Sequence, residues 1–174
     1  MLNIGNISLR AIEPEDVDFI LDIENDSSIW HVSNIHNPFS RFDIEQYVLL
    51  SDKDVYSAKQ IRFIICDNSN PQPINIGIID VFDFDAHNRR AGIGIIVVEK
   101  MRNRGYAAKA LDILIDYMMN ELNIHQLFCN IGMDNKNSIE LFESRGFERV
   151  GIKKDWNLVN NIWIDELLLQ LINP

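Results

Sequence analysis

Two groups of residues in this sequence have types and spacing suited to chemistry, and the first is a glycine-bearing turn. Met101-Arg102-Asn103-Arg104-Gly105-Tyr106-Ala107 follows the apolar run Ile93–Val98 and precedes apolar residues at helical spacing. A helix that begins directly after a strand has unpaired N–H groups at its start, where its dipole favours negative charge. The turn therefore favours binding of an anion such as phosphate, and Arg102, Arg104 and Lys109 add positive charge beside it.

The second group is a run of acids, Ile79-Asp80-Val81-Phe82-Asp83-Phe84-Asp85, in which aspartates alternate with apolar residues. The alternation predicts that the carboxylates of Asp80, Asp83 and Asp85 project from one face of a strand. A catalytic or amine-binding role is one interpretation of such a row of carboxylates. An ordinary solvent-exposed strand face is the other, and both remain open.

Strands and helices that would position these groups can be predicted along the whole chain. Acids and proline at 13–16 begin one helix, and Ser40-Arg41-Phe42-Asp43 is typical of a capped start of a second. The predicted order is β-α-α-β-β-β-α-β-α-β-β, with strands at 4–10, 61–66, 74–84, 91–98, 126–131, 148–156 and 162–172 and later helices at 107–122 and 135–145. We expect an α/β (α+β) domain over residues 1–174, with a mixed sheet of about seven strands flanked by about four helices.

The composition and net charge of the sequence limit the kinds of molecule that this protein can be expected to bind. The 174 residues are 47% hydrophobic and 24% charged, which is typical of a folded globular domain. A formal net charge of −10 disfavours nucleic acid as the main partner, since phosphate binding needs a basic surface. Such a charge suits a cationic substrate, although many proteins are acidic for solubility alone.

Cys66 and Cys129 both fall in predicted strands, so we expect buried, reduced thiols and a cytoplasmic protein. The first residues lack a basic segment followed by an apolar core, so no signal peptide is expected. No apolar run approaches the roughly 18 residues of a membrane span. The histidines lack ligand spacing, so no metal site is predicted; they are His31, His36, His87 and His125.

Two blocks of sequence together resemble a known superfamily. Arg102-x-x-Gly105-x-Ala107 is similar to the Gln/Arg-x-x-Gly-x-Gly/Ala signature of the GNAT acyl-CoA-dependent N-acetyltransferases. Asn135-x-x-Ser138-x-x-Leu141-Phe142-x-x-x-Gly146-Phe147 resembles a second block of that superfamily. The predicted element order is also similar to the GNAT fold, so the resemblance covers nearly the whole chain.

The resemblance implies that acetyl-CoA is the co-substrate. The strand 95–97 should offer backbone groups to the pantetheine arm, and amides of the turn should hold the pyrophosphate. Asn135 and Ser138 should contact the far side of the cofactor, although Asn135 is also a good helix N-cap. The implied cofactor-binding residues are Ile95, Ile96, Val97, Arg102, Asn103, Arg104, Gly105, Tyr106, Ala107, Asn135 and Ser138.

The implied reaction is attack of a neutral amine on the thioester carbonyl, which needs a base for the ammonium proton. The family's acceptor site lies near the end of the acidic strand, so Asp83 is the first candidate base and Asp80 the second. Many members have a tyrosine as general acid where this chain has Phe142, so no acid is assigned.

Shorter similarities point to the spermidine acetyltransferase and RimL/RimJ branches. They lie in His87-Asn88-Arg89-Arg90-Ala91, in Asn123-Ile124-His125-Gln126-Leu127 and in Asp165-Glu166-x-x-x-Gln170-Leu171. By this resemblance Glu24, Trp30 and Asp85 are candidate substrate-binding residues. The alternative interpretation is structural: Glu24 would lie at a solvent-exposed helix end, and Trp30 would anchor a loop.

Three functions follow from the resemblance. The first is acetylation of a small cationic amine such as a polyamine, and the second is acetylation of a protein N-terminus. The third is acyl-CoA binding without transfer, which the phenylalanine at position 142 permits. The sequence does not determine which amine is the acceptor. It does not determine the oligomeric state either, and a homo-oligomer is one of the open alternatives.

Overall fold

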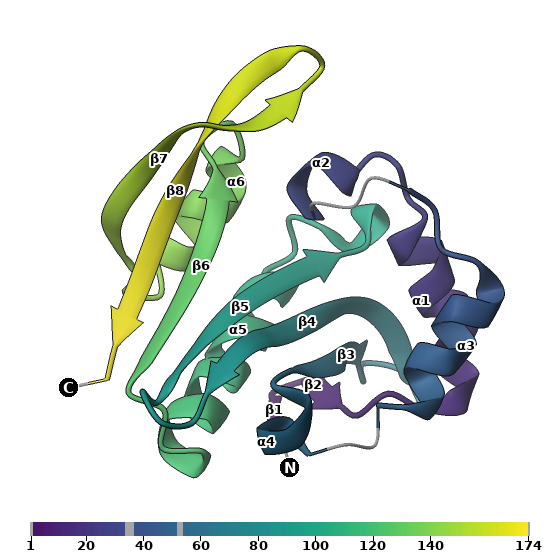
Figure 1. The fold of residues 1–174 in the computed structure, drawn as a ribbon. Helices are drawn as coiled ribbons and strands as arrows, with labels where there is room; N and C mark the ends of the chain where they lie inside the picture. Colours follow the sequence, from purple (N-terminus) through teal and green to yellow (C-terminus); the bar gives the residue numbers. More distant parts are fainter. Residues whose placement is uncertain (1, 34–36, 52–53, 174) are drawn as a thin grey trace.

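The computed structural model describes residues 2–33, 37–51 and 54–173, and eight strands in these ranges form one sheet (Figure 1). All neighbouring strands pair antiparallel except β5 and β6, so the predicted mixed sheet is confirmed. In sheet order the strands are β1 (Asn3–Ile4), β2 (Ile7–Arg10), β3 (Ile61–Asp67), β4 (Ile74–Asp85), β5 (Arg90–Val97), β6 (Gln126–Gly132), β8 (Ile162–Ile172) and β7 (Glu148–Val159).

The sheet has one strand more than the seven expected, because the predicted first strand is a short hairpin. Ile4 pairs with Ile7 across a turn in which Gly5 has a φ of +58°. Glycine adopts this left-handed conformation without the steric cost that a Cβ would bring. The chain therefore reverses within two residues where the apolar pattern predicted one continuous strand.

The four predicted helices are present, together with short helical segments that the sequence pattern did not predict. The predicted ones are α1 (Val17–Glu24), α3 (Arg41–Leu49), α5 (Tyr106–Asp116) and α6 (Lys136–Glu143). A 3-10 turn at Pro14–Asp16 precedes α1, another at Glu99–Met101 follows β5, and a π-helical turn at Tyr117–Glu121 extends α5. The unpredicted helices α2 (Trp30–Ser33) and α4 (Val55–Ala58) have four residues each, too few to show a helical period.

The capped start predicted for the second helix is confirmed. The Ser40 hydroxyl accepts a hydrogen bond from the Asp43 amide at 3.1 Å, and the Asp43 carboxylate accepts one from the Ser40 amide at 2.9 Å. This reciprocal capping box pairs two backbone N–H groups that the helix itself leaves free. It fixes where α3 begins.

Both faces of the sheet are covered by helices, and the alternation along β3 shows this directly. Phe63 and Ile65 pack in the core that contains α5, whereas Ile64 and Cys66 pack in the core that contains α1 and α3. Successive strand residues point to opposite faces, so one short apolar strand serves both cores. Figure 1 shows α5 on one side of the sheet and α1 with α3 on the other.

The sheet opens in its middle, between β5 and β6. These parallel strands pair only at Arg90–Gln126, Ala91–Leu127 and Gly92–Phe128 and then diverge, as Figure 1 shows. From Ile93 to Val97, β5 remains paired with β4 but has no partner strand on its other edge within the described ranges. Apart from the Val97 carbonyl, which accepts from the Arg102 side chain, the backbone groups on that edge are therefore available to a ligand.

No helix in the described ranges is long and apolar enough to cross a membrane.

Candidate functional site

Two adjoining cavities lie at the opening between β5 and β6. One, of about 500 Å³, is lined by the glycine-bearing turn and is called the turn cavity. The other, of about 650 Å³, contains Glu24, Asp80 and Glu166 and is called the carboxylate cavity. The residues that line both are His31, Val32, Ile95, Ile96, Asp134, Asn135 and Ser138. A molecule held along the free edge of β5 can thus extend from one cavity into the other.

Gly105 gives the turn cavity its shape. Its φ of +76° is left-handed, and a Cβ built at this position would meet no atom within 4 Å. Glycine allows the backbone conformation, and the space beside it leaves the amides at the start of α5 open to the cavity. The Arg102 guanidinium Nε donates to the Val97 carbonyl at 2.9 Å and ties the turn to the end of β5.

Two side chains of the turn region point elsewhere. The Tyr106 hydroxyl donates to Asp67 at 2.9 Å, and the Lys109 ammonium donates to the Asn6 side chain at 3.1 Å. Hydrogen bonds from Ser69 above all, and then those from Tyr106 and Asn6, lower the pKa of Asp67 to about 2. This network fixes α5 to β3 and to the first hairpin, so Lys109 contributes less positive charge to the turn than we expected.

The predicted cofactor-binding residues gather largely in this region. Those that line the turn cavity are Ile95, Ile96, Val97, Arg102, Asn103, Gly105, Ala107, Asn135 and Ser138. Arg104 and Tyr106 do not line it, so their predicted part in cofactor binding is not supported by the cavity. Asn135 caps α6, since its carboxamide oxygen accepts the Ser138 amide hydrogen bond at 3.3 Å. The individual contacts of these residues with a ligand stay predictions.

An ion-paired triad forms one wall of the carboxylate cavity. Arg62 on β3 donates to Asp80 on β4 at 2.6 Å and 3.0 Å, and it also pairs with Glu24 at the end of α1. Its guanidinium lies 5.3 Å from the centre of the Tyr47 ring. Burial works to lower the pKa of Arg62, but the charge and hydrogen bonds of Asp80 raise it above the ordinary value. The triad therefore carries one net negative charge into the cavity.

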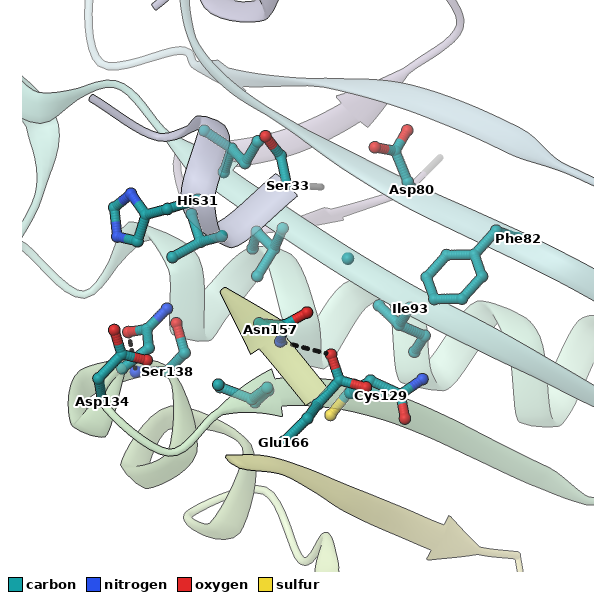
Figure 2. Close-up of a pocket in the computed structure, with 18 of the residues that line it drawn as sticks. His31, Ser33, Asp80, Phe82, Ile93, Cys129, Asp134, Ser138, Asn157 and Glu166 are labelled. Carbon is teal, nitrogen blue, oxygen red and sulfur yellow. Dashed lines mark hydrogen bonds between the residues drawn. The ribbon is translucent and has the colours of Figure 1, made fainter. Parts of the chain in front are cut away.

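The three aspartates of β4 do not share a face, and that prediction was wrong. Asp80 lines the carboxylate cavity with Phe82, as Figure 2 shows, whereas Asp83 is exposed and lines neither cavity. Asp80 and Asp83 are three positions apart, so the two-residue period of a strand places them on opposite faces. A β-bulge between Phe82 and Asp85, with Asp83 at a φ of +48°, further disturbs the strand there. Asp85 lies at the β4–β5 turn, where its carboxylate accepts from Asn88 and pairs with Arg90.

The predicted substrate residues near α1 differ in position. Glu24 is buried and faces the carboxylate cavity through the triad. The Trp30 indole N–H instead donates to the Glu24 carbonyl at 2.8 Å, which links α2 to the end of α1, and Trp30 lines neither cavity. The geometry therefore supports a structural role for Trp30, which holds α2 against the end of α1, rather than contact with a substrate.

A second charged cluster, which the sequence did not indicate, lies on the opposite wall. The Lys153 ammonium on β7 donates to Glu166 on β8 at 2.8 Å. The Asn157 amide donates to the other Glu166 oxygen at 3.2 Å, and Figure 2 draws this bond as a dashed line. The partners are brought together by strand pairing across a bulge, so no spacing along the chain signals them. With Asp134 and the triad, the cavity holds four carboxylates against two cations, a formal charge of −2 with His31 neutral.

Phe142 and Cys129 are buried residues that line this cavity. Phe142 is buried and packs edge-on against Phe147 at 5.0 Å between ring centres, so this wall has no hydroxyl from residue 142. Cys129 and Cys66 are buried and free, as predicted. Burial raises the pKa of the Cys129 thiol to about 12, so it is protonated at neutral pH and is a poor nucleophile.

No group of three or more histidine, cysteine, aspartate or glutamate side chains in the described ranges is arranged to hold a metal ion. His36, one of the scattered histidines, lies outside those ranges.

An open β-edge beside a helix N-terminus can hold an extended ligand that bears an anionic group, and the adjoining cavity rich in carboxylates can hold a cationic group. Residues 6–148 match the family model described as an acetyltransferase (GNAT) domain. The chain therefore belongs to the GNAT family, as the two sequence blocks predicted, and is an N-acetyltransferase that uses acetyl-CoA. The lining of the turn cavity fits that donor, and acetyl-CoA supplies the activated acetyl group when bound.

Among curated proteins, the spermidine N(1)-acetyltransferase of Vibrio cholerae is 26% identical over 148 residues, which cover 84% of this chain and 82% of that protein. The ribosomal protein uS5-alanine N-acetyltransferase of Escherichia coli is 33% identical over 82 residues, covering 47% and 42%.

Solved structures of the spermidine N-acetyltransferase of Vibrio cholerae share the fold. One, in complex with CoA and spermine, superposes with a TM-score of 0.83 at 23% identity and covers 96% of this chain and 95% of that one. A dodecameric structure gives a TM-score of 0.79 at 23% identity, covering 96% and 94%. The predicted GNAT fold is confirmed.

Proposed function

We propose that this enzyme acetylates a primary amine of a small cationic acceptor of the polyamine class. The observation that carries the proposal is the excess of carboxylates in the cavity that adjoins the turn cavity. A flexible chain of ammonium groups is attracted by such a wall, because each ammonium pairs with an acid or an amide oxygen. The spermidine acetyltransferases among the relatives support the same acceptor class.

In this proposal Asp80 and Glu24 attract the acceptor, while Arg62 holds both carboxylates in place. Asp80 accepts two hydrogen bonds from Arg62, so taking a proton from the acceptor would weaken a bidentate pair. Asp80 is therefore better suited to binding the ammonium than to acting as the base. Asp83, the first candidate base, would act only if the acceptor reached the exposed bulge of β4.

Residue 142 cannot protonate the leaving group, the CoA thiolate, because it is a phenylalanine. An alkyl thiol ionises at a pH of about 8.5, so a thiolate is a tolerable leaving group near neutral pH. Because Phe142 is enclosed by Phe147 and lacks a hydroxyl, we propose that water or the start of α6 stabilises the departing sulfur.

The test is release of free thiol from acetyl-CoA in the presence of a panel of amines. We expect turnover with spermidine or spermine and little with butylamine. Turnover only with a peptide that has a free N-terminus would replace this proposal by protein N-terminal acetylation, as in the uS5-alanine relative. Thermal stabilisation by CoA with no turnover on any acceptor would indicate a binding module.

We also propose that copies of the chain associate through the β7–β8 hairpin. Leu158 and Trp163 face each other across its end and are 55% and 57% exposed, and neighbouring Ile162 is 63% exposed. Apolar side chains gathered at the end of a hairpin favour burial by another protein surface. Light scattering on the wild type and on a Trp163→Ser variant tests this: a monomeric wild type would contradict it.

A cytoplasmic location remains part of the proposal, supported by two buried cysteines that are free. Fractionation of cells expressing the tagged chain tests it, and recovery in an extracellular or membrane fraction would contradict it.

A further inference from the structure

The ammonium of Lys153 occupies a corner of the carboxylate cavity that has the features of an ammonium-binding site. It donates to Glu166 at 2.8 Å and to the Asn130 side-chain oxygen at 2.9 Å, and it lies 4.7 Å from the centre of the Trp156 ring. A carboxylate, an amide oxygen and an aromatic face are three partners that a primary ammonium favours. Each of these residues lines the cavity.

The corner is shaped by a bulge in the edge strand. Lys153 pairs with Glu166 and Asn157 with Ile164, so three residues of β7 lie opposite Asp165 alone. The Asp165 carboxylate accepts from the Asp155 amide at 3.0 Å and from the Lys154 ammonium at 2.6 Å, which fixes the bulge. Asp155 has a φ of +48° in this bulge. As a result Lys153 and Trp156 both reach the cavity.

The carboxylate in this corner is preorganised. The Glu166 side chain is only 6% exposed, and its second oxygen accepts from Asn157 at 3.2 Å, so it stays in place if Lys153 leaves. Lys153 differs, because its side chain is 34% exposed and hangs from an edge strand on a flexible stem. Glu166 is thus the fixed carboxylate of the corner, and the Lys153 ammonium is its exchangeable cation.

We infer that Glu166, Asn130 and Trp156 form a second ammonium subsite of the acceptor cavity, and that Lys153 determines specificity by competing for it. In the free enzyme Lys153 neutralises Glu166, so an acceptor's distal ammonium must displace it. This inference rests on the proposed function, since it concerns acceptors with more than one ammonium group.

Removing the competitor tests the inference. In Lys153→Met, Glu166 is left for the acceptor, and we expect the Kd of spermidine and spermine, measured by calorimetry with CoA present, to fall about tenfold. The Kd of butylamine, which has one ammonium group, should stay unchanged. Adding Glu166→Gln to Lys153→Met should abolish the gain, and Lys153→Gln gives a second, polar variant if the methionine variant folds poorly.

Arg149→Met is the matched control. Arg149 lies on the same strand, pairs with the Glu143 carboxylate at 2.5 Å and lines neither cavity, so its loss changes the net charge equally without touching the bulge. A gain for spermidine in this variant, an equal gain for butylamine in Lys153→Met, or no gain in either Lys153 variant would overturn the subsite. Because the readout is binding, absence of acetyl transfer to every amine would refute only the proposed function.

Discussion

Arg62 and Asp80 lie directly opposite each other on β3 and β4, and two hydrogen bonds of 2.6 Å and 3.0 Å join their side chains. The same guanidinium also pairs with Glu24, and its side chain is 17% exposed. One cation thus holds two acids at the wall of the carboxylate cavity.

Replacing that cation should destabilise the protein. We expect Arg62→Met to lower the free energy of unfolding by about 3 kcal/mol, because two largely buried carboxylates lose their counter-ion. Urea denaturation measures the loss. Arg149→Met, which breaks the exposed pair of Arg149 with Glu143, is the control and should leave stability nearly unchanged. Equal losses in the two variants would mean that burial of the triad is unimportant.

The two candidate bases of β4 can be separated by matched variants. Asp80→Asn removes a charge that faces the cavity, so we expect a higher KM for spermidine and a smaller change in kcat. Asp83→Asn removes the same charge from the exposed bulge, and from the geometry we expect little effect. Steady-state kinetics at neutral pH decides the matter: a sharp fall in kcat for Asp83→Asn alone would establish Asp83 as the base.

Gly105 should matter for CoA binding through its backbone. An alanine at a φ of +76° costs about 1 kcal/mol, and the turn relaxes by moving its amides away from the cavity. We expect CoA to bind about fivefold more weakly to Gly105→Ala, measured by calorimetry. Gly151→Ala is the control, because that position in β7 also has open space but no positive φ. Unaltered CoA affinity in Gly105→Ala would show that the backbone amides of this turn do not bind CoA.

The buried thiol of Cys129 should make the free energy of unfolding depend on pH in the alkaline range. Burial raises the pKa of its thiol from 9.0 to about 12, so the folded state keeps a proton that the unfolded state loses above pH 9. Its contribution to stability is complete below the unfolded pKa and is lost as the pH rises toward the folded pKa.

The stability difference between wild type and Cys129→Ala should therefore shrink as the pH is raised from about 8 to about 10.5, in urea titrations at each pH. Cys66 is present in both proteins, so its own titration cancels. A difference that is constant with pH would show that the thiol is not protected.

Regular alternation and helix caps made most of the fold predictable. The capping box at Ser40 indicated where α3 starts. The apolar run at 61–66 indicated β3, whose residues are continuously apolar because they pack alternately into the cores on the two faces of the sheet. The reversal at Gly5 and the four-residue helices α2 and α4 were missed, because a period needs more residues than these segments have.

The turn cavity was predictable and the carboxylate cavity was only partly so, for a physical reason. Residues 95–97 and 102–107 are close in sequence, so a local pattern describes them. Arg62 meets Asp80, and Lys153 meets Glu166, only through strand register. Two bulges, at Asp83 and at Asp155, shift that register, and a period of two along one strand does not reveal them.

The divergence of β5 from β6 also bears on aggregation. An unpaired strand edge normally invites another chain to add a strand to it. Here the free edge from Ile93 to Val97 is buried or half-buried and lies beside α2 and α6 residues that line the cavities, so it is less accessible to a second chain than an outer edge. The outer edge strand β7 is open instead, and its bulge with Lys154 and Asp155 breaks the flat edge that a second chain would need. The enzyme thus keeps the inner edge of β5 open for a ligand and hinders pairing at the outer edge of β7.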